Sequence, residues 1–318
     1  MLASRVLHFG LDREELFFEC NTHFNCECVA IENSERDKGS LKTYLNRALV
    51  AVEAEPNNPR KMRLLWKAYN LICQNYTARK LTRPEDTLPA ISSLMGKFSN
   101  FFGKYFAGLW EHTLISNLQW YSAHRPDLQN FIPHRTHDIA PTFSWASRTG
   151  HICYHSPNRH CVYTEKGFEP ATVLDVHCTP LGNDPFGKVS SGGYITLRGI
   201  ITELEVKSIG GESIFLKLRG IGGEEIYGSC DGTFDTIEDA NGATASTKVI
   251  CFEVERTHRK IESGERWCIY VMVLRPVEGR KGYYRRIGFC KIEIEGRSYL
   301  DPPLISKGIP EKRDITII

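Results

Sequence analysis

Cysteine and histidine side chains cluster near the start of the chain at a spacing that could hold a metal. Cys20, His23, Cys26 and Cys28 lie within nine residues, and four such side chains can bind a zinc ion. The spacing lacks the paired Cys-x-x-Cys knuckles of common structural zinc sites. Alternation along a strand would also place the side chains on opposite faces. The sequence therefore favours buried or edge thiols here, without a metal or a cofactor.

A second cluster combines His151, Cys153, His155, His160 and Cys161. A metal site or a Cys–His nucleophile is conceivable at this spacing, but the sequence assigns it no Asn or Asp partner. The motifs Gly-x-Gly-x-x-Gly, Gly-x-Ser-x-Gly and His-Glu-x-x-His and the P-loop do not occur in the sequence. We therefore predict surface and hairpin side chains for this cluster and no enzymatic activity for the chain.

A third group of residues is basic and aromatic. It comprises Arg256, Arg259, Lys260, Arg280, Lys281, Tyr283, Tyr284, Arg285 and Arg286. Five glutamates are interleaved with it, namely Glu253, Glu255, Glu262, Glu265 and Glu278. Mixed charge of this kind is more typical of a solvated strand face than of a nucleic-acid surface. The 40 Lys and Arg of the chain nearly balance its 38 Asp and Glu, so bulk charge favours neither nucleic acid nor membrane.

The apolar pattern predicts the elements that position these residues. Val6 to Cys20 reads as two strands around a turn, and a helix is expected from Leu41 to about Glu53. A second helix starts near Pro59 and carries one apolar stripe. The stripe contains Met62, Leu65, Trp66, Tyr69, Ile72, Cys73 and Tyr76.

A third helix is expected to start at a capping box formed by Thr82 and Glu85. In such a box the Thr hydroxyl accepts from the backbone N–H of the Glu, and the Glu carboxylate returns to that of the Thr. Pro84 fits the first turn, where a missing N–H costs nothing. One buried face is predicted behind this start, made of Leu88, Ile91, Leu94, Met95, Phe98 and Phe102.

The pattern of turn residues and apolar runs changes after Gly150. Gly-Gly, Asp-Gly and Asn-Gly pairs separate short runs such as Tyr194–Ile201 and Cys268–Leu274. Regular turn signals between β-branched and aromatic runs predict an antiparallel sandwich or barrel. The predicted fold class is therefore α+β, with a strand pair in 1–30, a helical region in 31–150 and an antiparallel β domain in 151–318.

Cysteine usage and hydropathy predict the compartment. The 11 cysteines are odd in number and scattered, which fits the reduced thiols of a cytoplasmic protein. No basic-then-apolar leader opens the sequence. The most apolar segment, from Phe98 to Trp120, is interrupted by Lys104, Glu111 and His112. It reads as a buried helix, not as a membrane span.

Several motifs in the same order resemble the region that follows the HET domain in fungal heterokaryon-incompatibility proteins. They are Trp66, the segments 76–79, 81–82 and 86–91 (Tyr-Thr-Ala-Arg, Leu-Thr and Asp-Thr-Leu-Pro-Ala-Ile), then 105–110, 118–120 and 141–147 (Tyr-Phe-Ala-Gly-Leu-Trp, Leu-Gln-Trp and Pro-Thr-Phe-Ser-Trp-Ala-Ser). Phe143 stands where the family more often has Trp. The strand pair at 4–9 and 15–20 resembles the end of the HET domain, and 283–288 and 315–318 resemble the family's closing strands.

The resemblance implies a part in fungal nonself recognition and in the cell death that follows hyphal fusion. It implies structural roles for Thr82, Glu85, Asp86, Leu88, Pro89, Ala90, Gly108, Leu109, Trp110, Trp120, Ser144, Trp145, Arg286 and Gly288. The family's HET domain, which is distantly similar to TIR signalling domains, should precede Ser4, where only three residues stand. We expect a protein partner, or self-association, through the N-terminal strands. The alternative is a stand-alone ligand- or protein-binding module built on the β domain, and an enzyme using the cluster at 151–161 is the third reading.

Overall fold

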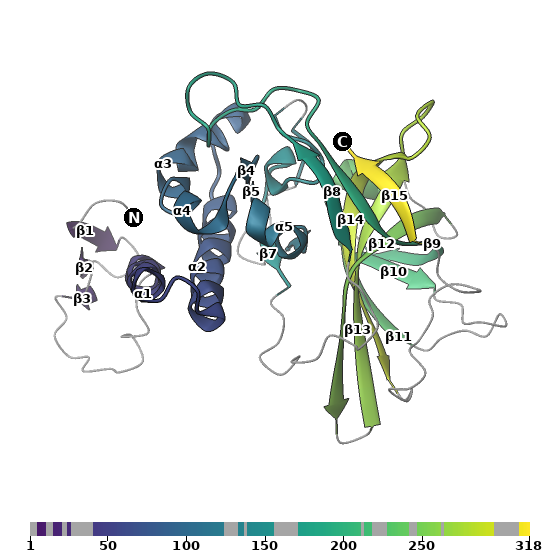
Figure 1. Ribbon diagram of the computed structural model, residues 1–318, viewed down its shortest axis with the longest axis horizontal. Coiled ribbons are helices and arrows are strands. Elements are labelled where there is room, and N and C mark those ends of the chain that lie inside the picture. The colour runs from purple at the N-terminus through teal and green to yellow at the C-terminus, as the bar shows by residue number, and fades with distance from the viewer. Residues whose placement is uncertain are drawn as a thin grey trace. The chain divides into compact units, whose positions relative to one another are not determined.

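The computed structural model describes residues 5–10, 15–20, 24–26, 41–123, 133–136, 139–155, 171–210, 213–217, 228–241, 247–261, 264–295 and 312–318 (Figure 1). The chain divides into two compact units, Met1–Tyr76 (unit 1) and Thr77–Ile318 (unit 2). Helices and a large, mainly antiparallel sheet are both present, so the predicted α+β class is confirmed. No described helix has the length and apolar character needed to span a membrane.

Unit 1 holds a small antiparallel sheet, and its strands are β1 (Arg5–Gly10), β2 (Glu15–Cys20) and β3 (Phe24–Cys26). The predicted hairpin is therefore confirmed, and β3 extends it by one strand. Two helices follow, α1 (Leu41–Ala54) and α2 (Pro59–Thr77). Asn58 begins α2, because its side-chain oxygen accepts a hydrogen bond of 3.0 Å from the N–H of Arg60.

The helix predicted behind Thr82 is instead broken into short turns: η2 (Pro84–Asp86), η3 (Pro89–Ile91), α3 (Ser92–Met95) and α4 (Ser99–Phe102). The predicted capping box is wrong, since Arg83 is the N-cap residue of η2 and its side chain makes no capping hydrogen bond. Pro89 explains the break, because it donates no backbone hydrogen bond and its ring excludes a continuous helix. The buried face was predicted correctly, and all six of its apolar residues are at most 7% exposed.

The buried helix predicted from Phe98 to Trp120 is wrong, because Gly103 and Gly108 adopt positive φ and interrupt it. Unit 2 instead continues with short elements that connect these turns to the sheet. They are β4 (Tyr105–Phe106), β5 (Leu109–Trp110), η4 (Glu111–Thr113), α5 (Leu114–Asn117), β6 (Trp120–Ser122), η6 (Trp145–Ser147) and β7 (Ile152–Tyr154). β4 pairs with β5, and β6 pairs with β7.

The large sheet contains β8 (Thr172–His177), β9 (Tyr194–Gly210), β10 (Ser213–Lys217), β11 (Gly228–Phe234), β12 (Lys248–Ile261), β13 (Gly264–Pro276), β14 (Tyr283–Glu295) and β15 (Lys312–Ile317). A short helix, α6 (Ile237–Asn241), follows β11. The strand order is β10-β11-β14-β13-β12-β9-β15, with β8 paired to β9. Further pairings of β10 with β9 and of β14 with β15 close the sheet on itself, which is the closure of a barrel.

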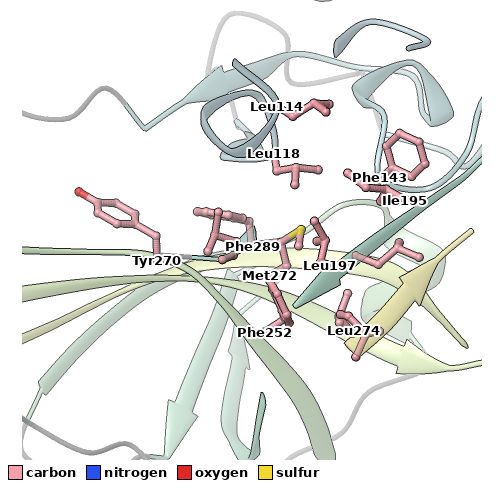
Figure 2. Close-up of a cluster of buried hydrophobic side chains, with 14 of the residues drawn as sticks. Leu114, Leu118, Phe143, Ile195, Leu197, Phe252, Tyr270, Met272, Leu274 and Phe289 are labelled. Atoms are coloured by element: carbon pink, nitrogen blue, oxygen red, sulfur yellow. The ribbon is translucent and has the colours of Figure 1, made fainter. Parts of the chain in front are cut away.

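Both faces of the central strands are buried. Along β13, Trp267, Ile269, Val271 and Val273 belong to one apolar cluster, and Cys268, Tyr270, Met272 and Leu274 belong to another on the opposite face. This period of two follows from the strand geometry. Figure 2 shows the second cluster, in which Leu114, Leu118 and Phe143 face the side chains of the sheet.

The segment before Gly150 and the sheet share this second core. Leu109, Leu114 and Phe143 pack in the same cluster as Leu197 and Phe289 of the sheet. The boundary predicted at residue 150 therefore falls inside unit 2. The change in composition there marks a change in secondary structure, because the short elements upstream need the sheet to cover their apolar side chains.

Candidate functional site

A fully buried arginine lies at the centre of unit 2. Arg286, on β14, is 0% exposed, and its ion-pair partner Asp235 is also 0% exposed. Its Nε donates to Asp235 Oδ2 at 3.1 Å, its Nη1 donates to the carbonyl of Leu118 at 2.7 Å, and its Nη2 donates to the carbonyl of Trp120. Burial lowers the pKa of the guanidinium, and the charge of Asp235 opposes this effect. The donors of this buried charge are therefore bonded to two separate segments, residues 118–120 and the residue that follows β11, as burial requires.

A second ion pair lies beside the first. Arg135 donates to Asp239 Oδ2, to Ser147 Oγ at 3.0 Å and to the backbone carbonyl of Arg286 at 3.1 Å. Thr236 Oγ1 also donates to Asp239 Oδ2, at 2.8 Å. Burial raises the pKa of Asp239, and the charge of Arg135 opposes this rise. The two pairs fasten α6 and the segment around Arg135 to β14.

The tryptophans of the sequence motifs anchor the same region. Trp120 Nε1 donates to the carbonyl of Phe143 at 2.9 Å, and Trp145 Nε1 donates to the carbonyl of Gly108 at 2.9 Å. Gly108 has φ +97°, and an added Cβ would lie 2.6 Å from Trp145 Nε1. Only glycine fits this close approach. Ser144 completes the contact by donating from Oγ to the carbonyl of Ala107.

Of the remaining motif residues, some are buried in unit 2 and others lie at or near its surface. Leu88, Leu109 and Trp110 are 0% exposed, and Gly288 pairs on β14 with Phe234 and Val273. Another group lies at or near the surface: Thr82, Glu85 and Ala90 are exposed, and Asp86 and Pro89 are half-buried.

The two candidate Cys/His clusters, for which we predicted no metal and no nucleophile, lie only partly within the described residues. His23, Cys28, His160 and Cys161 lie outside the described residues. The described residues contain no group of three or more metal-binding side chains. His155 instead stacks on Tyr121, with ring centroids 4.2 Å apart, and the nearest contact between His151 and Cys153 is 3.9 Å from Nε2 to Sγ.

The predicted solvated face is wrong for three of its charged residues. Glu253 and Arg256 are each 4% exposed and form an ion pair of 2.7 Å, and Arg286 is buried as described above. A register shift between Glu253 and Glu255 is the reason for the pair. In a regular strand, residues three apart face opposite sides, and a bulge residue brings them to the same side.

A pocket of about 600 Å³ lies beside the β13–β14 hairpin and is called the hairpin pocket below. Its polar lining includes Arg135, Ser190, Ser191, Glu238, Asp239, Arg275, Glu278 and Arg285, and its apolar lining includes Pro141, Pro276, Val277, Ile287 and Ile318. This volume is in the range of small-molecule sites, and mixed apolar and polar linings are typical of them. Every one of these lining residues belongs to unit 2.

Two arginines of the hairpin pocket face each other across the sheet. Arg275 and Arg285 are direct cross-strand partners on β13 and β14, and both are exposed. Like charges in this position destabilise a strand pair by up to about 1 kcal/mol. Arg285 was placed in the basic group from the sequence, but Arg275 was missed. The one sequence feature that marks Arg275 is its position before Pro276, at the end of an apolar run.

Comparisons with known proteins return no family model, no curated protein and no solved structure that matches this chain. The candidate site has a buried part, the hydrogen-bonded network around Arg286, and an open part, the hairpin pocket.

Proposed function

We propose that this chain is a recognition module of the heterokaryon-incompatibility type, which acts by binding and not by catalysis. The observation that carries the proposal is the convergence of motif residues from separate segments around Arg286. Trp120 and the 141–147 motif meet β14 there through the hydrogen bonds of Trp120, Phe143 and Arg286. Motifs that form one structural unit support the resemblance on which the cytoplasmic, nonself-recognition role rests.

The N-terminal sheet supports a protein partner. Leu7 is 63% exposed and Phe18 is 37% exposed, and the two residues are direct cross-strand partners on β1 and β2. A paired, exposed leucine and phenylalanine on a strand surface favour association. The proposed occupant of this surface is a HET domain, with a second copy of the chain as the competing outcome.

The experiment is light scattering on the purified chain, alone and with a separately purified HET domain of the family. We expect a complex with the HET domain that the variant Leu7→Ser/Phe18→Ser no longer forms. Val50→Ser is the matched control, because Val50 is 65% exposed and lies on α1, outside the strands. If the chain formed only homo-oligomers, the occupant would be a second copy. If it stayed monomeric and did not bind the HET domain, the proposal would be contradicted.

The role in fungal cells needs a separate readout. Hyphae that express the chain are fused with hyphae that lack it, and cell death is scored in the fused cells. We expect death in these fusions and normal growth when Arg286→Met is expressed, because the motif network is then broken. Normal growth with both forms would contradict an incompatibility role.

The hairpin pocket favours a second candidate function, a stand-alone ligand-binding module. The pocket is large enough for a small molecule, and its lining combines arginine and serine side chains with prolines and aliphatic residues. Such linings bind ligands that carry both a charged group and an apolar body. Saturable binding of a small molecule, lost when the lining is changed, is the test of this candidate.

A further inference from the structure

The hairpin pocket holds two arginines, Arg275 and Arg285, that have no carboxylate partner among the residues that the structure describes. Arg275 donates from Nη2 to the backbone carbonyl of Asp239 at 3.3 Å, which is a neutral acceptor. Arg285 forms no ion pair or hydrogen bond through its side chain with the residues that the structure describes. Two opposed guanidinium groups without an anion between them raise the free energy of the strand pair. A bound anion would remove this cost.

The acidic side chains that line the pocket are mostly engaged elsewhere. Asp239 accepts hydrogen bonds from Arg135 and Thr236, and Glu238 pairs with Nδ1 of His134 at 2.7 Å. Glu278, at the hairpin turn, is the remaining carboxylate among the described lining residues. None of these three carboxylates forms an ion pair with Arg275 or Arg285.

Hydroxyl and apolar groups complete the wall. Ser190 and Ser191 line the pocket together with the two arginines, and neither hydroxyl is bonded to a described residue. Pro276 and Val277 add apolar surface. Guanidinium groups bind tetrahedral oxyanions with paired N–H donors, and serine hydroxyls supply further donors.

We propose that the hairpin pocket binds the phosphate group of a small organic phosphate monoester, held by Arg275 and Arg285 with Ser190 and Ser191 as further donors. A phosphate dianion balances both guanidinium charges, whereas a carboxylate balances one. Pro276 and Val277 contact the organic part of the ligand. The assignment rests on the ligand-binding candidate above and names the chemistry of its ligand.

Isothermal titration calorimetry tests it with three probes at neutral pH and constant ionic strength: phenyl phosphate, inorganic phosphate and benzoate. We expect phenyl phosphate to bind tightest, since it offers both a dianion and an apolar ring. Arg275→Ala and Arg285→Ala should each weaken its binding roughly ten- to a hundredfold, because each removes hydrogen bonds to a charged group. Arg285→Lys, which keeps the charge and loses the paired donors, should lie between wild type and Arg285→Ala.

Arg280→Ala is the matched control. Arg280 is exposed on the same hairpin, lies 3.9 Å from the centre of the Tyr283 ring and is not a lining residue. The substitution removes the same charge, so an equal loss of binding would show general charge attraction and overturn the proposal. Arg285→Ala should unfold at the same temperature as wild type or higher, and a clear drop would mean that Arg285 supports the fold instead.

The remaining outcomes separate the two proposals. Benzoate binding as tightly as phenyl phosphate would overturn the phosphate assignment and leave the pocket as a carboxylate site. No binding of any probe would overturn the site itself. Neither result affects the light-scattering test of Leu7 and Phe18, because those residues belong to unit 1 and the pocket is lined by unit 2.

Discussion

The guanidinium carbon of Arg286 lies 3.5 Å from the centre of the Trp120 ring, although the two residues are 166 positions apart. A cation over an indole face is stabilised by the negative charge of the ring face. Arg286 also donates to the backbone carbonyl of Trp120. One side chain of β14 therefore holds the backbone and the ring of β6 in place.

Removal of Arg286 should destabilise the protein strongly. Arg286→Met leaves the buried Asp235 with Arg135 alone, at 3.9 Å, and removes the donors to the carbonyls of Leu118 and Trp120. We expect a loss of about 3–5 kcal/mol in the free energy of unfolding. Denaturant titration measures this loss. Arg285→Met is the control, since the neighbouring side chain is exposed and its removal should leave stability unchanged or raise it by up to about 1 kcal/mol. Similar losses in both variants would contradict the central place of Arg286.

Gly108→Ala should be much worse than an alanine at another glycine of positive φ. Gly108 has φ +97° and Gly282 has φ +82°, so both substitutions carry a backbone cost of about 1–2 kcal/mol. An added Cβ at Gly108 meets Trp145 Nε1, whereas at Gly282 nothing lies within 4 Å. We expect a further loss of about 1–3 kcal/mol at Gly108 alone. Thermal melts of the two variants give the difference, and equal values would refute the close contact.

Trp110→Ala should open a large cavity. Its ring is fully buried and packs with Phe102 and Tyr105 at centroid distances of 6.0 and 4.9 Å. Loss of a buried tryptophan costs about 3–5 kcal/mol. Thr82→Ala should change stability by less than about 0.5 kcal/mol, because Thr82 is exposed and Arg83 is the N-cap residue. If Thr82→Ala lowered the free energy of unfolding by about 1 kcal/mol, Thr82 would cap the helix after all.

His155 should make stability depend on pH. Burial, with a smaller effect from Lys291, lowers the pKa of His155 from 6.5 to about 4. Because this pKa is depressed by folding, the unfolded chain binds the proton more readily between these values. The contribution of the neutral ring is complete above pH 6.5 and is lost as the pH falls toward 4.

The size of this effect follows from the shift. Between about pH 7 and pH 5 we expect wild type to lose on the order of 2 kcal/mol more than His155→Phe. The phenylalanine preserves the stacking on Tyr121 and cannot be protonated. Denaturant titrations at the two pH values provide the measurement, and equal pH dependence in both proteins would mean that His155 is not protonated on unfolding.

Local patterns predicted much of the fold. The 3.6-residue period placed α2 and its buried stripe, and the apolar positions from Leu88 to Phe102 are buried as expected. Turn signals after Gly150 predicted the antiparallel sheet. These features depend on residues close in sequence, so they can be read without the tertiary structure. The break at Pro89 could have been predicted as well, since proline does not continue a helix.

Adjacent arginines show what only the tertiary structure decided. Arg285 and Arg286 are identical in type, yet Arg285 is exposed in the hairpin pocket and Arg286 is completely buried. The sequence determined that consecutive strand residues point to opposite faces. It did not determine which face is covered, because Leu118, Trp120 and Asp235, which enclose Arg286, come from other segments. Long-range packing made one arginine part of the core and left the other exposed to solvent.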